Sequence, residues 1–276
     1  RRSSKKSTKR RKSKKMRGGV TTRSGVRRGN YRVLSPLKIL KSTRLPSDVF
    51  GEILEMHPLF STKLTNATIR RAVRDYSNSR SRAVVTKLFG KIENWDVSNV
   101  TDMSHAFCDK DCKYFNQPLN KWNVSNVTNM KGMFRGAISF NQPLNNWNVS
   151  KVTDMSIMFS NTKYFNQPLK NWNVSNVTDM FGMFTHAESF NQPLNNWNVS
   201  KVMDMSIMFQ DAISFNQPLN NWNVSNVKKM GWMFEYAGSF NQPLNDWNVS
   251  NVDRKWDMFN GAHSFNQPLH APWYVE

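Results

Sequence analysis

A histidine and two cysteines near residue 110 are the residues whose types and spacing could support metal or redox chemistry. The segment 105–112 reads HAFCDKDC, and a Zn²⁺ ion could be held by His105, Cys108, Cys112 and a carboxylate. A spacing of three residues between cysteines is not the usual knuckle, and in an oxidising compartment the same pair could form a disulfide. We interpret both as ordinary loop cysteines and expect no metal and no cofactor.

The other histidines do not fall into a catalytic pattern. They are scattered along the chain without a partnered nucleophile, at His57, His186, His263 and His270. No P-loop, G-x-S-x-G or H-E-x-x-H motif occurs. The N-V-S and N-V-T triplets would be glycosylation acceptors in a secretory pathway, but we interpret them as part of a repeat that needs strands and turns. The sequence therefore predicts a protein that is not an enzyme and has no small-molecule substrate.

Positive charge is concentrated at the start of the chain. Residues 1–44 hold 18 of the 39 Lys and Arg residues and no acidic residue, whereas the remaining residues are nearly neutral, with 21 basic and 19 acidic side chains. Residues 1–15 contain no apolar residue, and such a density of like charge predicts a disordered polycationic arm. The side chains that we expect to bind a partner are Arg1, Arg2, Lys5, Lys6, Lys9, Arg10, Arg11, Lys12, Lys14, Lys15 and Arg17.

Two interpretations of this arm have equal weight. Residues 1–32 could bind nucleic acid, because each Lys or Arg that meets a phosphate releases a condensed counterion, or an acidic protein surface in an assembly. Alternatively, the arm is a solubilising tail or a patch of the nuclear-localisation type. It lacks the apolar stretch of a signal peptide. No apolar run approaches the roughly 20 residues of a membrane helix, so we expect no membrane span.

Residues 45–94 predict a small helical cap. The segment 45–54, LPSDVFGEIL, has Pro in a first turn followed by apolar residues at helical spacing, and it resembles the opening of an F-box. A second helix is expected from Asn66 as the capping residue, with apolar Ile69, Ala72, Val73 and Tyr76 on one face. A third is expected to carry Ala83, Val84, Val85 and Leu88 and to end at Gly90.

From residue 95 onward the sequence repeats itself. Seven units begin with Trp95, Trp122, Trp147, Trp172, Trp197, Trp222 and Trp247, and each closes with the same five residues, FNQPL. All spacings are 25 residues except the first, which is 27. A fixed period in this range is typical of a solenoid, whose units bury their apolar faces against one another. The units span residues 95–270, and residues 271–276 are expected to cap the array.

One unit predicts a strand and a helix. Trp147 and Val149 are two residues apart, as on one face of a short strand. Met155, Met158 and Phe159 are spaced as on one face of a short helix, which Thr153 or Asp154 would cap. The predicted core contains Trp122, Trp147, Trp172, Trp197, Trp222, Met133, Met158, Met183, Met208, Phe140, Phe165, Phe190 and Phe215.

The first and last units depart from this pattern, as capping requires. The asparagine of each FNQPL segment is expected to form a ladder that satisfies turn backbone groups rather than binding a ligand. This ladder would contain Asn116, Asn141, Asn166, Asn191, Asn216, Asn241 and Asn266.

The segment 95–103, WDVSNVTDM, together with the recurring M-F and F-N-Q words, resembles the BspA-like leucine-rich repeat family. The resemblance covers about residues 66–270. It implies an α/β repeat, a leucine-rich-repeat-like solenoid of seven 25-residue strand–helix units with a small N-terminal α-helical cap and a disordered-type basic arm. Bacterial adhesins, mycoplasma lipoproteins and proteins of large DNA viruses share this repeat, and the lead-in of residues 66–94 resembles the viral arrays.

These features together predict a structural, protein-binding role. The units are nearly copies of one another, and their differences are concentrated around the expected helix, as at His186 and Tyr236. Such uniformity suits repeated weak contacts in an assembly. With the basic arm, this favours a minor capsid or core-associated component of a large DNA virus, found in the virion or the infected-host cytoplasm. One alternative is an F-box-like adapter that presents targets through the repeats. Another is an adhesin of the bacterial cell surface.

Overall fold

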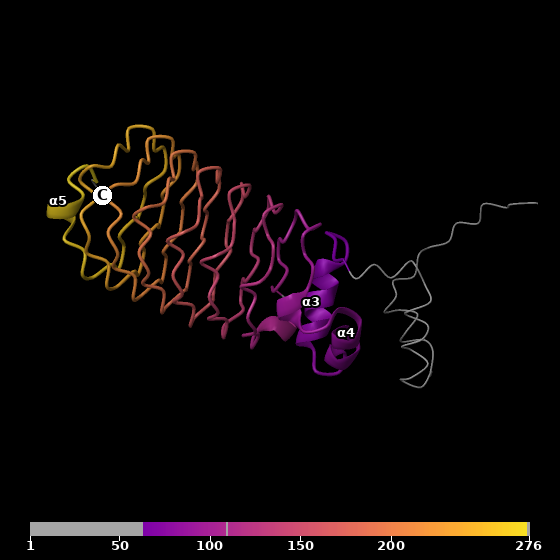
Figure 1. Cartoon of the computed structure of the whole chain (residues 1–276). Coiled ribbons are helices and arrows are strands. Elements are labelled where there is room, and N and C mark those ends of the chain that lie inside the picture. The colour runs from indigo at the N-terminus through magenta and orange to yellow at the C-terminus, as the bar shows by residue number, and fades with distance from the viewer. Residues whose placement is uncertain (1–62, 109, 275–276) are drawn as a thin grey trace, which may run out of the picture. The chain divides into compact units, whose positions relative to one another are not determined.

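The computed structural model describes residues 63–108 and 110–274 (Figure 1). The basic arm (1–44), the F-box-like segment (45–54) and Asp109 lie outside the described residues, so the predictions made for them stay predictions. The described elements are helices α3 (Ile69–Ser77), α4 (Arg82–Phe89) and α5 (Gln267–His270), and 3₁₀ turns η1 (Ile92–Asn94) and η2 (Lys110–Cys112).

The predicted strand–helix, leucine-rich-repeat-like fold is wrong. Among the described residues the units contain no strand, and their helical elements are limited to η2 in the first unit and the four-residue α5 at the end of the last. The chain instead runs through seven coils that lie on one another (Figure 1). Neighbouring coils share a single parallel bridge position, formed by Asp102, Asn129, Asp154, Asp179, Asp204, Lys229 and Arg254.

Two consecutive turns stand where the helix was expected. The N–H of Met158 donates to the carbonyl of Met155, and the N–H of Thr162 donates to the carbonyl of Phe159. The third residue of each turn is left-handed, with φ of 50° at Ile157 and 59° at Asn161. A left-handed residue cannot continue a right-handed helix. The spacing of Met155, Met158 and Phe159 predicted a helix wrongly, because a turn of this kind also brings residues i and i+3 together.

Backbone donors alternate between the coil itself and its neighbour. Met155 donates its N–H to the carbonyl of Asp179 at 3.0 Å, and Phe159 donates to Met183 at 2.9 Å. The intervening N–H groups, such as that of Met158, close the turns within the coil. Because buried backbone donors need partners, this alternation lets the coil exist without a regular strand or helix.

The expected strand is too short to form. The N–H of Trp147 donates to Leu144, and the N–H of Val152 donates to Val149, so turns flank the segment on both sides. Trp147 and Val149 are nonetheless 3 % and 1 % exposed. Residues two apart in an extended stretch point the same way, so the burial pattern was correct although the element was not.

The thirteen residues expected in the core are all buried in the structure. Equivalent rings form columns along the stack, with centroids of Trp172 and Trp197 6.4 Å apart and those of Phe159 and Phe184 5.6 Å apart. The rings within each column are nearly parallel. Each fully buried Phe contributes about 1.5–3 kcal/mol through removal of apolar surface from water, so the core depends on neighbouring coils.

The asparagine ladder is confirmed, and it does more than expected. The side-chain oxygen of Asn141 accepts the backbone N–H of Asn166 and the side-chain amide of Gln167, both at 3.0 Å. The glutamine of each FNQPL segment was not recognised as part of the ladder. A parallel series uses the indoles: Trp172 donates Nε1–H to the carbonyl of Leu144, 28 residues earlier in the chain, at 2.9 Å.

Helices α3 and α4 form where the pattern predicted them, and Gly90 ends α4 with a φ of 73°. Asn66, however, is not the N-cap of α3, which is Thr68. Its side-chain oxygen accepts the N–H of Thr101, and Arg70 donates to the carbonyl of Ser104 at 2.6 Å. Side chains at the start of α3 thus satisfy backbone groups of the first coil, as a preceding coil would.

The C-terminal residues cover part of the last coil. Trp273 stacks 6.2 Å from Trp247 and donates Nε1–H to the carbonyl of Leu244, which continues the tryptophan series by one step. The carbonyl of His270 accepts the N–H of Leu244. None of the helices in the described part of the chain has the length and apolar character needed to cross a membrane.

Candidate interaction surface

The two turns of each coil form the side of the stack on which the units differ most. We call this side the turn face. The third residues of the first turns are His105, Gly132, Ile157, Gly182, Ile207, Trp232 and Asp257, and those of the second turns include Gly136, Asn161, His186, Asp211, Tyr236 and Gly261. The FNQPL segments are identical in all seven units. Variation concentrated on one face is what a binding surface built on a repeat requires.

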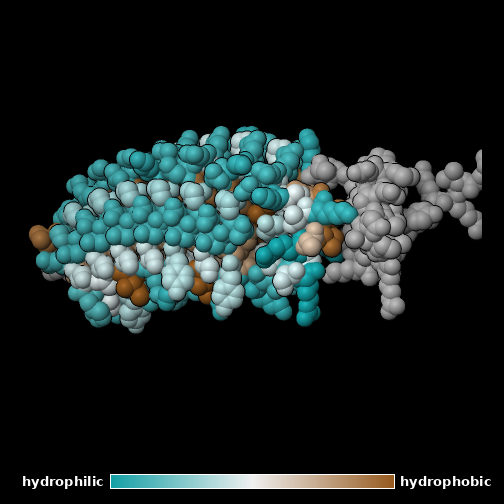
Figure 2. Space-filling model, turned by 60° about the horizontal axis from the view of Figure 1, so that its bottom comes forward, coloured by the Kyte–Doolittle hydropathy of each residue, from teal (hydrophilic) through white to brown (hydrophobic). Residues whose placement is uncertain are grey.

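Large hydrophobic side chains are exposed in and beside these turns. Phe181 is 38 % exposed, Tyr236 49 % and Trp256 52 %. Ile213 and Tyr164, which directly follow turns, are exposed to a similar degree. Figure 2 shows hydrophilic residues in continuous rows along the stack with isolated hydrophobic side chains among them. Exposed aromatic side chains among polar residues are typical of protein-binding surfaces.

Backbone strain is stored on the same face. Ile157 and Ile207 have φ values of 50° and 51°, and a β-branched residue in the left-handed region is an outlier that costs about 1–3 kcal/mol. Gly132 and Gly182 take this conformation at the equivalent positions of neighbouring coils without that cost. The fold therefore accepts glycine here, so it does not itself require isoleucine.

A bulky side chain at the third position of a turn lies over the glycine at the equivalent position of the next coil. A Cβ on Gly132 would come within 2.6 Å of the His105 ring, and one on Gly261 would collide with the ring of Tyr236. Alternation of large and small residues therefore shapes the turn face into ridges, each made by a side chain that lies along the stack.

The charges of the turn face have both signs. Lys163 pairs with Glu188 at 2.8 Å, and His186 lies 3.5 Å from Asp211. These pairs join neighbouring coils and are partly exposed. The face therefore carries no single-sign patch that would select a polyanion.

Carboxylates of three successive coils align beside the turns, at the bridge positions Asp154, Asp179 and Asp204. Burial raises the pKa of Asp179, and the carboxylates of Asp154 and Asp204 raise it further. Asp204 is compensated by Lys229 at 3.0 Å. Within the described residues no group of three His, Cys, Asp or Glu side chains is arranged to hold a metal ion.

Asp102, at the first bridge position, behaves differently. Burial opposes its ionisation, but hydrogen bonds from Ser104 and Arg70 outweigh burial and lower its pKa. The difference from Asp179 follows from the side chains of α3, because Arg70 reaches the carboxylate of Asp102 at 2.6 Å.

Among the described residues, which leave out Asp109, the His105 and cysteine cluster is not assembled as a metal site. Both Cys108 and Cys112 are thiols; Cys112 is buried and donates to the hydroxyl of Ser77 at 3.4 Å. His105 lies against Gly132, and burial, followed by the charges of nearby Arg and Lys side chains, lowers its pKa. Of the other histidines, His57 lies outside the described residues, and His270 lies beside Phe265 rather than a nucleophile.

The N-V-S triplets form turns. The side-chain oxygen of Asn148 accepts the N–H of Ser150 at 3.1 Å, and Asn173 and Ser175 repeat this contact. An Asx turn needs this residue pair at this spacing, which agrees with the interpretation of the triplets as part of the repeat.

The turn face was recognised in the sequence only as a place where units differ. A signal for its geometry was present, since Gly132, Gly136, Gly182 and Gly261 all occupy left-handed third positions. Glycine recurring at the third position of a four-residue segment indicates a turn with φ above zero, and the segment was instead interpreted as a helix.

These features define a repeat protein whose coils stack through their backbones and present a variable face. The chain belongs to the family described as "Mycoplasma protein of unknown function, DUF285", which matches residues 77–194 and 167–273. The resemblance to BspA-like repeats is confirmed at the level of the repeat family. The match does not support a leucine-rich-repeat fold or a viral setting. Neither a curated protein nor a solved structure matches the chain.

Proposed function

We propose that this chain is a non-enzymatic structural protein whose repeat body holds protein neighbours along the turn face. The observation that carries the proposal is the concentration of sequence variation and exposed aromatic side chains in and beside the turns, exemplified by Phe181 and Tyr236. The FNQPL segments do not vary between coils, so the differences that a partner could read lie mainly in the turns and at the bridge positions beside them.

The chemistry of the turn face suits a protein partner. Aromatic side chains supply large contact areas, and ion pairs of both signs can exchange partners at an interface rim. The turns of successive coils are joined by backbone hydrogen bonds, so weak contacts that one partner makes to several coils add through avidity.

We propose further that the protein is a component of the virion of a large DNA virus, with capsid or assembly neighbours on the turn face and the arm in contact with protein or nucleic acid. Support comes from the sequence alone: a strongly basic arm joined to a nearly neutral repeat body. An F-box-like adapter and a bacterial surface adhesin are the competing roles.

Site-specific crosslinking tests the turn face. A photo-crosslinking phenylalanine analogue replaces Phe181 in the full chain, and in a matched variant it replaces Lys170, which is exposed in the turn before Trp172. We expect one defined protein to be crosslinked from position 181 and not from position 170. Equal crosslinking from both positions, or none from 181, would overturn the proposal.

Fractionation of the source tests the setting. If the chain is a virion component, it co-purifies with particles, and protease cleaves its arm only after the particle interior is opened. Loss of protection on nuclease treatment would assign the arm to nucleic acid, whereas protection that persists would assign it to protein. Recovery only from host-cell or surface fractions would favour the adapter or the adhesin.

A further inference from the structure

The last coil carries backbone donors that face no further coil. In the inner coils, alternate N–H groups donate to the next coil, as Met155 does to Asp179. Within the described part of the chain, the equivalent N–H groups of the last coil have no acceptor. They belong to Lys255, Asp257, Phe259 and Gly261.

An acceptor is open on the same edge. In the inner coils the carbonyl of Thr153 accepts the N–H of Thr178 in the next coil. Asp253 occupies the equivalent position in the last coil, and no described group donates to its carbonyl. The edge thus retains the alternate donors and an acceptor through which an inner coil binds its neighbour. We call residues 252–261 the open edge.

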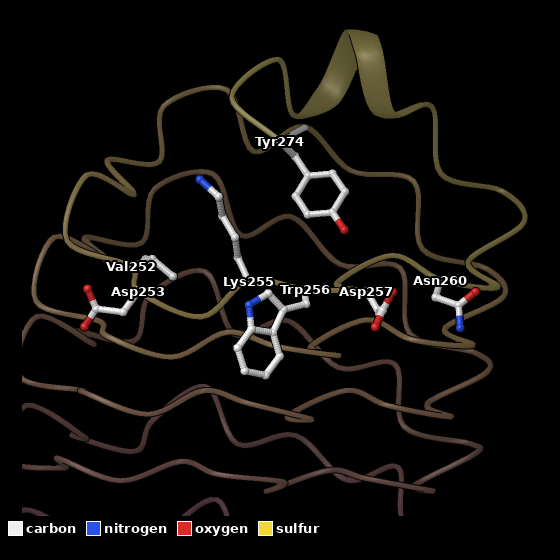
Figure 3. Close-up of a pocket in the computed structure, with 7 residues that line it drawn as sticks. All are labelled: Val252, Asp253, Lys255, Trp256, Asp257, Asn260 and Tyr274. Carbon is white, nitrogen blue, oxygen red and sulfur yellow. The ribbon is translucent and has the colours of Figure 1, made fainter. Parts of the chain in front are cut away.

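A pocket of about 450 Å³ lies over the open edge. It is lined by Val252, Asp253, Lys255, Trp256, Asp257, Asn260 and Tyr274. Figure 3 shows Tyr274, from the C-terminal segment, on one side of this space and the last coil on the other. The Tyr274 hydroxyl accepts the N–H of Met258 at 3.2 Å, so the C-terminal segment reaches one point of the edge but leaves the alternate donors.

The corresponding edge of the first coil is covered by side chains of α3 and the residues just before it. Asn66 accepts the N–H groups of Thr101 and Asp102, and Arg70 donates to the carbonyl of Ser104. These are the contacts that a preceding coil would make. A second copy of the chain therefore cannot stack its first coil on the open edge, because α3 occupies that position.

We propose that the open edge binds a coil-like segment of another polypeptide, which presents carbonyl groups at alternate residues and adds an eighth layer to the stack. Recognition of this kind adds main-chain hydrogen bonds at an exposed edge. This goes beyond the proposed function of the turn face and does not depend on it.

The six internal interfaces argue for this occupant. Each buries the same row of donors against alternate carbonyls, so the edge is a continuation of an interface that the chain already forms six times. Two last coils placed end to end would set donor rows against one another. The charges at the edge are mixed, with Lys255 beside Asp253 and Asp257, which does not favour a purely ionic ligand. Trp256, 52 % exposed, can cover an added layer.

Amide hydrogen exchange in the full chain tests the inference. The probe is a synthetic peptide that copies residues 150–165, whose carbonyls accept from a preceding coil in this structure. We expect the amides of Lys255, Asp257, Phe259 and Gly261 to exchange fast in the free monomer and to slow at least tenfold with the peptide. A scrambled peptide is the control and should leave them unchanged.

A proline variant provides a second, independent test of the inference. Lys255→Pro removes one donor that has no partner in the free chain, and proline is tolerated where an edge N–H faces solvent. We expect Lys255→Pro to weaken peptide binding roughly fivefold to tenfold, the equivalent of one backbone hydrogen bond, and Lys255→Ala to leave it unchanged.

Three results would overturn the proposal. The first is protection of these four amides in the free monomer, and the second is the absence of any peptide effect at millimolar concentration. The third is protection that appears only as the chain itself dimerises, which would make the occupant a second copy.

Discussion

The turn face and the asparagine side of the same coils hold the stack together in different ways. On the asparagine side, defined by the FNQPL segments, stacking depends on side chains: the Asn141 oxygen accepts two hydrogen bonds from the next coil. On the turn face, stacking depends on the backbone, as between Ile157 and Phe181. A backbone contact leaves its side chains free to vary, so recognition can evolve on the turn face without loss of the fold.

The largest effect is expected on the asparagine side. Asn166→Ala removes the acceptor of the Asn191 N–H and the Gln192 amide, and a partly buried donor left without a partner costs about 1–3 kcal/mol. We expect the free energy of unfolding, measured in urea, to fall by about 2–3 kcal/mol.

Asn266→Ala is the matched control for this prediction. Asn266 belongs to the same segment but no coil follows it, so we expect a loss of under about 0.5 kcal/mol, as for a typical surface change. Equal losses at both positions would show that the ladder does not carry the stacking.

A smaller loss of unfolding free energy is expected from replacing a left-handed glycine in a turn. Gly132 has a φ of 56° and its Cβ position is occupied by the His105 ring, so Gly132→Ala should lower the unfolding free energy by about 1–2 kcal/mol. Gly238→Ala is the control, because Gly238 has ordinary φ and open space at its Cβ. Thermal unfolding should separate the two variants, and similar melting temperatures would contradict the assignment of left-handed turns.

Removing the charge of a bridge-position carboxylate should raise the free energy of unfolding by an amount that depends on pH. Burial, followed by Asp154 and Asp204, raises the folded-state pKa of Asp179 above 3.8. The folded state therefore binds more protons than the unfolded chain in this window, so stability falls as pH rises through the folded pKa. Asp179→Asn should stabilise at pH 7, and this advantage should vanish as pH falls below that pKa.

Asn129 supports this design, since it holds the same turn with a neutral side chain by accepting the Lys131 N–H at 2.9 Å. Asp204→Asn, measured in the same pH series of urea titrations, is the control. It loses the ion pair with Lys229 and should not stabilise at pH 7. A pH-independent difference for Asp179→Asn would refute the proposed cause.

The smallest effect on stability is expected at an exposed turn-face residue. Phe181→Ser restores the serine present at Ser156 and Ser206, and we expect a change within about 0.5 kcal/mol. The same variant should reduce crosslinking of the partner from a probe placed at Tyr164. Unfolding of the variant would show instead that Phe181 serves the fold.

The repeat, its period and its core were readable from the sequence because they depend on spacing. Trp147, Val149 and Met158 are buried as expected, since any coil that closes after 25 residues returns equivalent side chains to the same column. The asparagine ladder followed from the same reasoning. The path of the chain inside each coil did not, because apolar residues at i, i+3 and i+4 fit a helix and a series of turns equally well.

The candidate surface was harder to predict from the sequence than the core. The sequence located the differences between units around residues such as His186 and Tyr236, but not the left-handed turns that present them. It gave no sign that Asn66 and Arg70 take the place of a preceding coil, because their partners are more than 30 residues away.

By itself, the sequence determined that seven near-identical units bury aromatic and methionine side chains against one another. Only the tertiary structure decided between helix and turn, because the choice depends on whether backbone donors such as that of Ile157 find a carbonyl in the next coil. The same reason governs the two ends of the stack. A hydrogen-bonding edge exists only once the coils are in register, so its closure by α3 and its opening at residues 252–261 could appear only in the folded chain.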